Sequence, residues 1–150
     1  MRRLSLLAAL LLCAGCLKQI ALGSVADSLS ASGNGYARDD DPELVRDSIP
    51  VIIKLMEQIH DAAPKHEALA VALAKAATSY GAAFIAEDAD RIEDHDVAAA
   101  RAVRGRAKRM FLRARGYGLD ALELEVPGLR AERSRGANQT ARPRSVSASL

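Results

Sequence analysis

Residues 66–91, HEALAVALAKAATSYGAAFIAEDADR, decide the fold. Apolar side chains recur three and four positions apart along this stretch, which is the spacing of one face of an α-helix. Alanine, the best helix former, is its commonest residue. We therefore expect a long core helix from about His66 to Arg91. Its expected buried residues are Leu69, Leu73, Ala76, Tyr80, Ala83 and Phe84.

A second helix is predicted before this one, between residues 41 and 62. Asp41 suits the N-cap and Pro42 suits the first helical position. Pro50 lies inside the run and predicts a kink or a break near Ile49. The expected apolar face consists of Leu44, Val51, Ile52, Leu55 and Ile59.

A third helix is predicted from about Val97 to Leu124, and Pro127-Gly128 ends it. Many arginines share this helix with the apolar seam, which would allow a nucleic-acid interface. We interpret them instead as a solvated face, because the net charge is only +2, and we expect no nucleic-acid partner. The expected seam consists of Ala100, Val103, Ala107, Met110, Phe111, Ala114, Gly118, Ala121 and Leu122.

An acidic segment, residues 87–96, separates the last two predicted helices. It could be a cation site, but it lacks the glycine and the alternating oxygen ligands of a calcium loop. We interpret it as a solvated turn in which Asp94 or Asp96 caps the next helix. No metal or cofactor is therefore expected.

Composition supports an all-α fold. Hydrophobic residues make up 49% of the chain and aromatic residues only 3%, so alanine carries much of the apolar fraction. We predict antiparallel helical hairpins with three main helices over residues 39–129. The Ser- and Gly-rich residues 16–38 are predicted to be a disordered tether, in which Ala21 to Leu29 could become helical on docking. The Arg/Ser-rich residues 130–150 are predicted to be a disordered basic tail.

The beginning of the chain contains its only cysteines, in residues 10–18, LLLCAGCLK. A redox CxxC would need a folded βαβ context, and a zinc site would need more ligands. Two arginines followed by a short apolar run and a small pair are instead typical of an export signal, residues 1–15. The cysteines could be incidental to an ordinary cleaved signal.

The Ala14-Gly15 pair before Cys16 also resembles the lipobox of bacterial lipoproteins. This resemblance implies cleavage before Cys16 and acylation of that residue with fatty acids such as palmitate. Cys13 stands where that motif usually has leucine. Leu17, in place of an inner-membrane retention aspartate, favours the outer membrane. We expect a lipid-anchored protein of the cell envelope whose body faces the periplasm.

Three blocks of sequence resemble the T component of tripartite ATP-independent periplasmic (TRAP) transporter systems. They are DDDPELVRDSIPVIIKLMEQI (39–59), ATSYGAAFIAEDADRIED (77–94) and RAKRMFLRARGYGLDALELEVPG (106–128). The resemblance implies a lipoprotein with a fold similar to tetratricopeptide repeats. It also implies further repeats after Pro127-Gly128, so this copy would be truncated or altered at its C-terminal end.

The resemblance further implies partners and a function. The family works beside a solute-binding P subunit and a membrane permease, is thought to self-assemble, and is thought to help handle a small apolar ligand. We therefore expect an accessory lipoprotein that docks the P subunit or its ligand at the membrane. The alternative is a general repeat-type scaffold lipoprotein of the envelope, which would share every physical feature.

Candidate groove residues are the aromatic side chains Tyr80, Phe84, Phe111 and Tyr117, together with Arg113. The aromatic residues could equally be core, and Arg113 could simply be exposed. Catalysis is not expected, because the three histidines are scattered and no HExxH, GxSxG or P-loop motif is present.

Overall fold

The computed structural model describes residues 22–31 and 38–140, and within these ranges every regular element is helical. The all-α prediction is therefore confirmed for the described part of the chain. Residues 22–31 form a helix that precedes the labelled elements. These are α2 (Pro42–Ala62), α3 (Glu67–Tyr80), the π-helical η3 (Gly81–Ala86), α4 (Glu87–Glu93), α5 (Val97–Glu125) and α6 (Leu129–Thr140).

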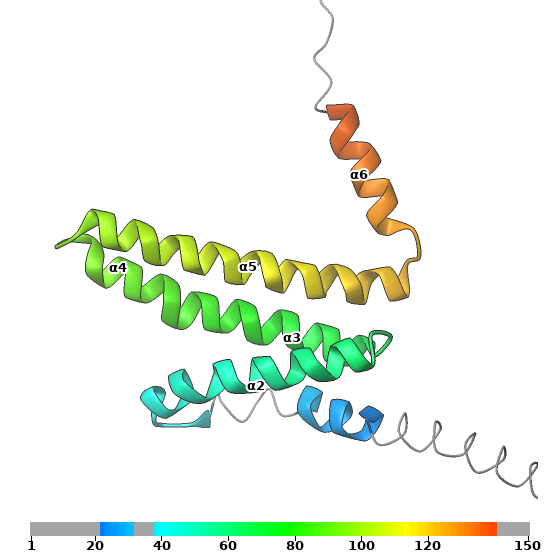
Figure 1. Ribbon diagram of the computed structural model, residues 1–150, viewed down its shortest axis with the longest axis horizontal. Helices are drawn as coiled ribbons and strands as arrows, with labels where there is room; N and C mark the ends of the chain where they lie inside the picture. The colour runs from blue at the N-terminus through cyan, green and yellow to red at the C-terminus, as the bar shows by residue number, and fades with distance from the viewer. Residues whose placement is uncertain (1–21, 32–37, 141–150) are drawn as a thin grey trace, which may run out of the picture.

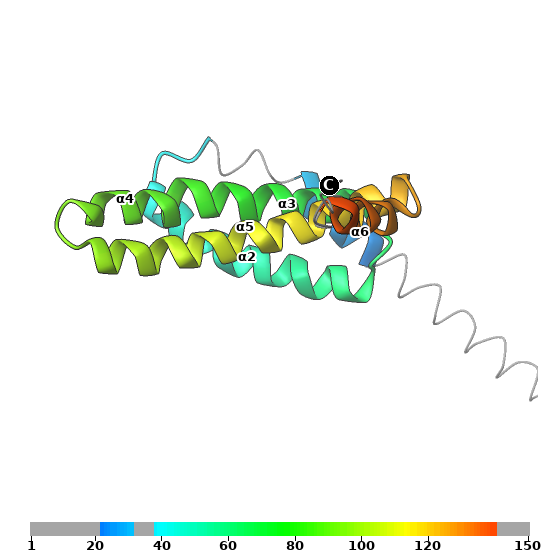
Figure 2. The ribbon, with the colours of Figure 1, turned by 90° about the horizontal axis from the view of Figure 1, so that it is seen from above.

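The elements α3, η3 and α4 follow one another without interruption and form the central rod of the fold (Figure 1). A short turn at residues 94–96 reverses the chain, so α5 runs back antiparallel along the rod (Figures 1 and 2). The helix α2 lies along the rod on another side. The predicted antiparallel hairpin between the long core helix and the helix that begins at Val97 is therefore present.

Local signals place the helix starts as expected. The Asp41 carboxylate accepts hydrogen bonds from the backbone N–H groups of Glu43 (3.1 Å) and Leu44 (3.0 Å). The Asp96 carboxylate accepts from the N–H of Ala99 at 2.8 Å, so it caps α5. Such caps satisfy N–H groups that have no partner inside the helix.

The helix α2 differs from its prediction at Pro50. It continues through this proline to Ala62, so the predicted break near Ile49 is absent. Proline removes one backbone donor, but Ile53 and Met56, in the turns that follow, are almost fully buried. Tertiary packing therefore maintains a helix that local propensity would interrupt.

The buried face of α2 agrees with the predicted one only in part. Ile59 is buried and Ile52 is partly buried against the core, as predicted, but Leu44, Val51 and Leu55 are 58%, 67% and 44% exposed. The buried stripe is therefore turned away from the predicted face. Its members are Val45, Ile53, Met56, Ile59 and His60. Both stripes have helical spacing, so periodicity alone could not choose between them.

The rod has apolar residues on more than one side because it contacts both α2 and α5. Leu69, Leu73 and Ile85 are almost completely buried, whereas Ala83, predicted to be buried, is exposed. The π-helical η3 explains this difference, because a π turn shifts the helical phase by about one residue. The buried positions accordingly pass from Tyr80 to Ile85.

By length and composition, residues Glu67–Glu93 would also suffice to cross a membrane, and no other described helix would. Such a stretch is equally typical of the core helix of a small bundle. Its position between α2 and α5 explains the composition without a bilayer (Figure 1).

Small side chains mediate the contact between α5 and the rod. Ala100, Ala107, Ala114 and Ala121 are buried at intervals of one heptad. Val103, Met110 and Tyr117 are half-buried at the second position of the same heptads. Phe111 and Leu122, predicted in the seam, are 38% and 45% exposed. The buried strip is therefore narrower than expected.

The predicted tether and tail both contain ordered helix. Residues 22–31 are helical, and Ala26 is fully buried against the core, although we expected a helix there only on docking. The helix α6 occupies Leu129–Thr140, where we expected a disordered tail. The remaining parts of both segments, residues 1–21, 32–37 and 141–150, lie outside the described residues.

The correction at α6 has a local cause. The Glu123 carboxylate accepts hydrogen bonds from the backbone N–H groups of Gly128 (2.7 Å) and Arg130 (2.9 Å). Gly128 has φ +95°, a conformation that glycine adopts without strain. The Arg130 guanidinium reaches Asp120 at 2.5 Å. The lack of apolar periodicity predicts disorder in the tail, but its arginines, alanines and glutamate are good helix formers.

The two stripes of α2 give a direct test of the fold. Ile53→Ala should lower the free energy of unfolding by about 2–5 kcal/mol, because it removes buried methyl groups. Val51→Ala, two residues away, should change it by less than about 0.5 kcal/mol. Urea unfolding followed by circular dichroism measures both. Equal effects at the two positions would refute this assignment of the buried face.

Candidate functional site

The candidate groove residues are distributed over three places in the structure. Tyr80 is buried beneath the contact of α2 with the rod, at 6% exposure, and Phe84 is half-buried beside it. Their ring centroids lie 5.6 Å apart at a tilt of 45°. Tyr80 therefore belongs to the core, as one reading of the sequence allowed.

An arginine of α2 covers this aromatic pair. The Arg46 guanidinium lies 5.1 Å from the Phe84 centroid, within the range of a cation–π contact. It also donates to both carboxylate oxygens of Asp88, at 2.7 and 3.0 Å. The hydrogen bond from Arg46 lowers the pKa of Asp88. This bidentate pair joins α2 to α4.

Tyr117 and Arg113 lie elsewhere, where α5 approaches the C-terminal half of α2. Both reach the carboxylate of Glu57, which accepts from the Tyr117 hydroxyl at 2.8 Å and lies 3.3 Å from the Arg113 guanidinium. Lys54 donates to the other oxygen of Glu57 at 2.6 Å. Glu57 is therefore the centre of a polar cluster between α2 and α5.

A buried histidine completes this cluster. His60 packs its ring edge-on against Tyr117, with centroids 5.6 Å apart. Its Nε2 lies 3.8 Å from a carboxylate oxygen of Asp120, and its buried Nδ1 has no hydrogen-bond partner among the described residues. Asp120 also pairs with Arg130, so the cluster extends towards α6.

The electrostatics of this cluster favour an ionised Glu57 and a neutral Tyr117. Burial by itself would raise the pKa of Glu57, but hydrogen bonds from Lys54 and Tyr117 and the nearby Arg113 lower it overall. Burial, followed by the hydrogen bond to Glu57, raises the pKa of the Tyr117 phenol. The phenol is therefore a stable hydrogen-bond donor and holds α5 to α2.

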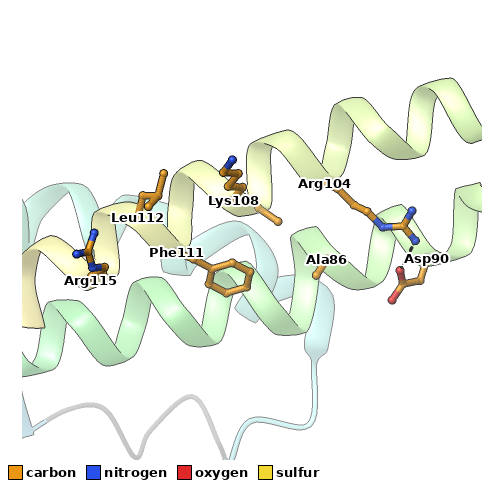
Figure 3. Close-up of a pocket in the computed structure, with 8 residues that line it drawn as sticks. Ala86, Asp90, Arg104, Lys108, Phe111, Leu112 and Arg115 are labelled. Atoms are coloured by element: carbon orange, nitrogen blue, oxygen red, sulfur yellow. Dashed lines mark hydrogen bonds and ion pairs between the residues drawn. The ribbon is translucent and has the colours of Figure 1, made fainter. Parts of the chain in front are cut away.

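Phe111 occupies the third location, on the side of the α5–rod contact that Figure 3 shows. Its ring lies over Gly81, where an added Cβ would come within 3.0 Å of Phe111 Cε1. Beside it is a hollow of about 430 Å³ lined by residues of η3, α4 and α5 (Figure 3). These are Ala86, Asp90, Arg104, Ala107, Lys108, Phe111, Leu112 and Arg115.

Arginines pair with several carboxylates of the acidic segment. Arg104 donates to Asp90 at 2.9 Å and pairs with both carboxylate oxygens of Glu93. Its hydrogen bond lowers the pKa of Glu93. Among the described residues, no group of three or more His, Cys, Asp or Glu side chains could hold a metal ion.

Sequence reasoning missed Glu57 and His60, which contact residues far away in the chain. It also missed His66, whose Nδ1 accepts from the Leu69 N–H at 3.2 Å and whose Nε2 lies 3.1 Å from Asp27. His66 therefore caps α3 and links it to the helix at residues 22–31. Cys16 lies outside the described residues.

Comparison with known proteins gives one family and one distant relative. The family described as TRAP transporter T-component matches residues 38–145. The match continues past Leu129 across much of the predicted tail. An uncharacterised protein of Treponema pallidum (strain Nichols) is 30% identical over 147 residues, which cover 88% of this chain and 46% of the relative. The chain thus spans about half the length of that relative, and no solved structure matches.

Replacing the central carboxylate tests the polar cluster. Glu57→Gln should lower the free energy of unfolding at pH 7 by about 1–2 kcal/mol, because the charged acceptor is lost. The folded-state pKa of Glu57 is lowered, so its contribution exists above the unfolded-state pKa and disappears as pH falls through the folded-state pKa. The difference from wild type should therefore shrink below about pH 4.

Urea unfolding at several pH values measures this effect. Asp47→Asn is the matched control, because Asp47 is an exposed carboxylate on the same helix. It should change stability by less than about 0.5 kcal/mol. An effect of Glu57→Gln that stayed constant down to acid pH would show that Glu57 does not act through its charge.

Proposed function

This chain belongs to the TRAP transporter T-component family, and on that premise we propose that it is a periplasmic accessory lipoprotein of a TRAP-type transport system. The observation that carries the proposal is the family match over residues 38–145. The family is an accessory component of a transporter and not an enzyme family. The remaining elements of the proposal are the anchor, the partner and the ligand.

The proposed anchor is an acylated Cys16. It is supported by the charged start, the short apolar run and the Ala14-Gly15 pair before the cysteine. Two or three acyl chains hold a protein firmly, since each buried CH₂ contributes about 0.8 kcal/mol. The body would then face the periplasm from a membrane surface, and Leu17 favours the outer membrane.

The proposed partner is a solute-binding P subunit. The anchor would keep the helical domain close to the membrane, and a surface of that domain would bind the P subunit or its small apolar ligand. Tyr80 is buried and Tyr117 is engaged by Glu57. Phe111, beside the hollow, therefore has the most exposed side chain of the four candidate aromatic residues.

The anchor is tested by replacing each cysteine. Cys16→Ser should abolish incorporation of labelled palmitate and release the protein from the membrane fraction. Cys13→Ser, the matched control three residues earlier, should be acylated normally. The intact mass of the detergent-extracted protein measures the acylation of each variant, and membrane fractionation measures its release. Acylation that survives Cys16→Ser would contradict the proposed attachment site.

The partner is tested with purified proteins. A TRAP solute-binding P subunit from the same cell should bind the acylated chain in isothermal titration calorimetry, whereas an unrelated periplasmic binding protein should not. Acylation without P-subunit binding would favour the alternative, a general scaffold lipoprotein of the envelope.

A further inference from the structure

Among the residues that the structure describes, one face of the α5–rod contact carries hollows that are lined by the rod and α5 alone. The helix α2 occupies a different side of the rod, where it meets Arg113, Tyr117 and Asp120 of α5. These hollows are the Phe111 hollow and, towards the other end of α5, a second hollow of about 190 Å³. Ala74, Gly118 and Leu122 are among its lining residues. We call this face, with its two hollows, the outer groove.

Both walls of the outer groove combine small and large side chains. The rod contributes Ala74 and Ala86 together with Val71, Lys75 and Asp90, among others, and α5 contributes small residues beside larger apolar groups. The larger apolar groups are accessible, because Phe111, Leu112 and Leu122 are 38%, 52% and 45% exposed. An amphipathic helix lying in the groove would bury these three side chains.

The length of the outer groove suits a helix. Its lining residues on α5 run from Arg104 to Glu125. At 1.5 Å per residue this corresponds to about 30 Å. An occupant of about twenty helical residues would therefore contact both hollows.

The charges of the groove define the chemistry of the occupant. Lys108 and Arg115 line the Phe111 hollow one heptad apart, and Figure 3 shows them on α5 to either side of Leu112. Neither has a carboxylate partner in the part of the chain that the structure describes, whereas Arg104 is paired with Asp90 and Glu93. The second hollow is mixed, with Lys75, Glu67 and Glu125. The uncompensated charge is therefore positive and lies beside Phe111.

The neighbouring helix α6 is a poor occupant. It leads away from the hairpin (Figure 1), and Arg130, Arg133 and Arg135 make it basic. Its cations would meet Lys108 and Arg115 of the same sign. Apolar groups that could replace water on Phe111 and Leu112 are also scarce in α6.

We propose that the outer groove binds an amphipathic helix of a partner protein, with acidic residues about one heptad apart beside its apolar stripe. The apolar stripe covers Phe111, Leu112 and Leu122, and the acidic residues pair with Lys108 and Arg115. The proposal rests on the proposed function only for the identity of the protein that supplies the helix. A partner lacking the acidic residues would leave the two cations uncompensated.

A pair of synthetic peptides tests this. Each has about 21 residues, enough for the length of the groove, with leucines on one face and either glutamates or lysines along both flanks. Fluorescence anisotropy measures their binding to the full chain in neutral phosphatidylcholine nanodiscs, with empty nanodiscs as baseline. The glutamate peptide should bind at least about tenfold more tightly than the lysine peptide, a difference of about 1.4 kcal/mol.

Variants then locate the site. K108E/R115E should reverse the preference between the peptides, whereas the matched charge reversal R133E/R135E on α6 should leave it unchanged. Leu112→Ser should weaken binding of the glutamate peptide without reversing the preference. All five positions are exposed, and circular dichroism checks that each variant is folded.

Three results would overturn the proposal. One is equal binding of the two peptides. Another is an equal response to the two charge reversals, which would indicate attraction to net charge alone. The third is self-association in analytical ultracentrifugation that K108E/R115E abolishes, because a second copy would then cover the groove. Binding of a P subunit that survives K108E/R115E would leave the proposed function standing while placing its contact elsewhere.

Discussion

The structure depends on the close approach of α5 to the central rod. Alanines one heptad apart occupy the contact, and an added methyl at Gly118 would lie 3.9 Å from the Cβ of Ala74. Small side chains gain little apolar burial individually, so the helices must be long and straight to bury enough surface. The 29 residues of α5 supply that length. The described residues contain no cysteine, so packing of this kind, and not a disulfide, holds the helices together.

The same close approach determines where the larger side chains go. Phe111 cannot enter the narrow contact and instead lies over Gly81 at its edge. Tyr117 leaves the contact on the other side and reaches Glu57 and His60 of α2. Each edge of the α5–rod contact thus carries an aromatic residue. One edge is closed by α2 and a polar cluster, and the other is the outer groove.

Features that depend on local chemistry could be predicted from the sequence. Asp41 and Asp96 cap helices because the groups that they satisfy are two or three residues away. The face of α2 could not be predicted, because Val51 and Ile53 belong to stripes of equal periodicity, and only the position of the rod selects Ile53. Glu57 and Tyr117, 60 residues apart, likewise become neighbours only through the hairpin. The helix α6 was missed because its polar sequence carries no amphipathic pattern.

The π-helical turn at Gly81–Ala86 accommodates about one residue more than a regular α-helix would hold over the same rotation. Removal of one residue, for example exposed Ala82, would let the rod continue as a regular α-helix. Because the extra residue and the π turn would disappear together, the side chains beyond them would keep nearly the same direction about the rod axis. Asp88 would still face Arg46, and Asp90 would still face Arg104. In evolutionary terms, a single-codon deletion would be tolerated better here than elsewhere in the rod, so alignments of related chains should allow a one-residue gap in this segment.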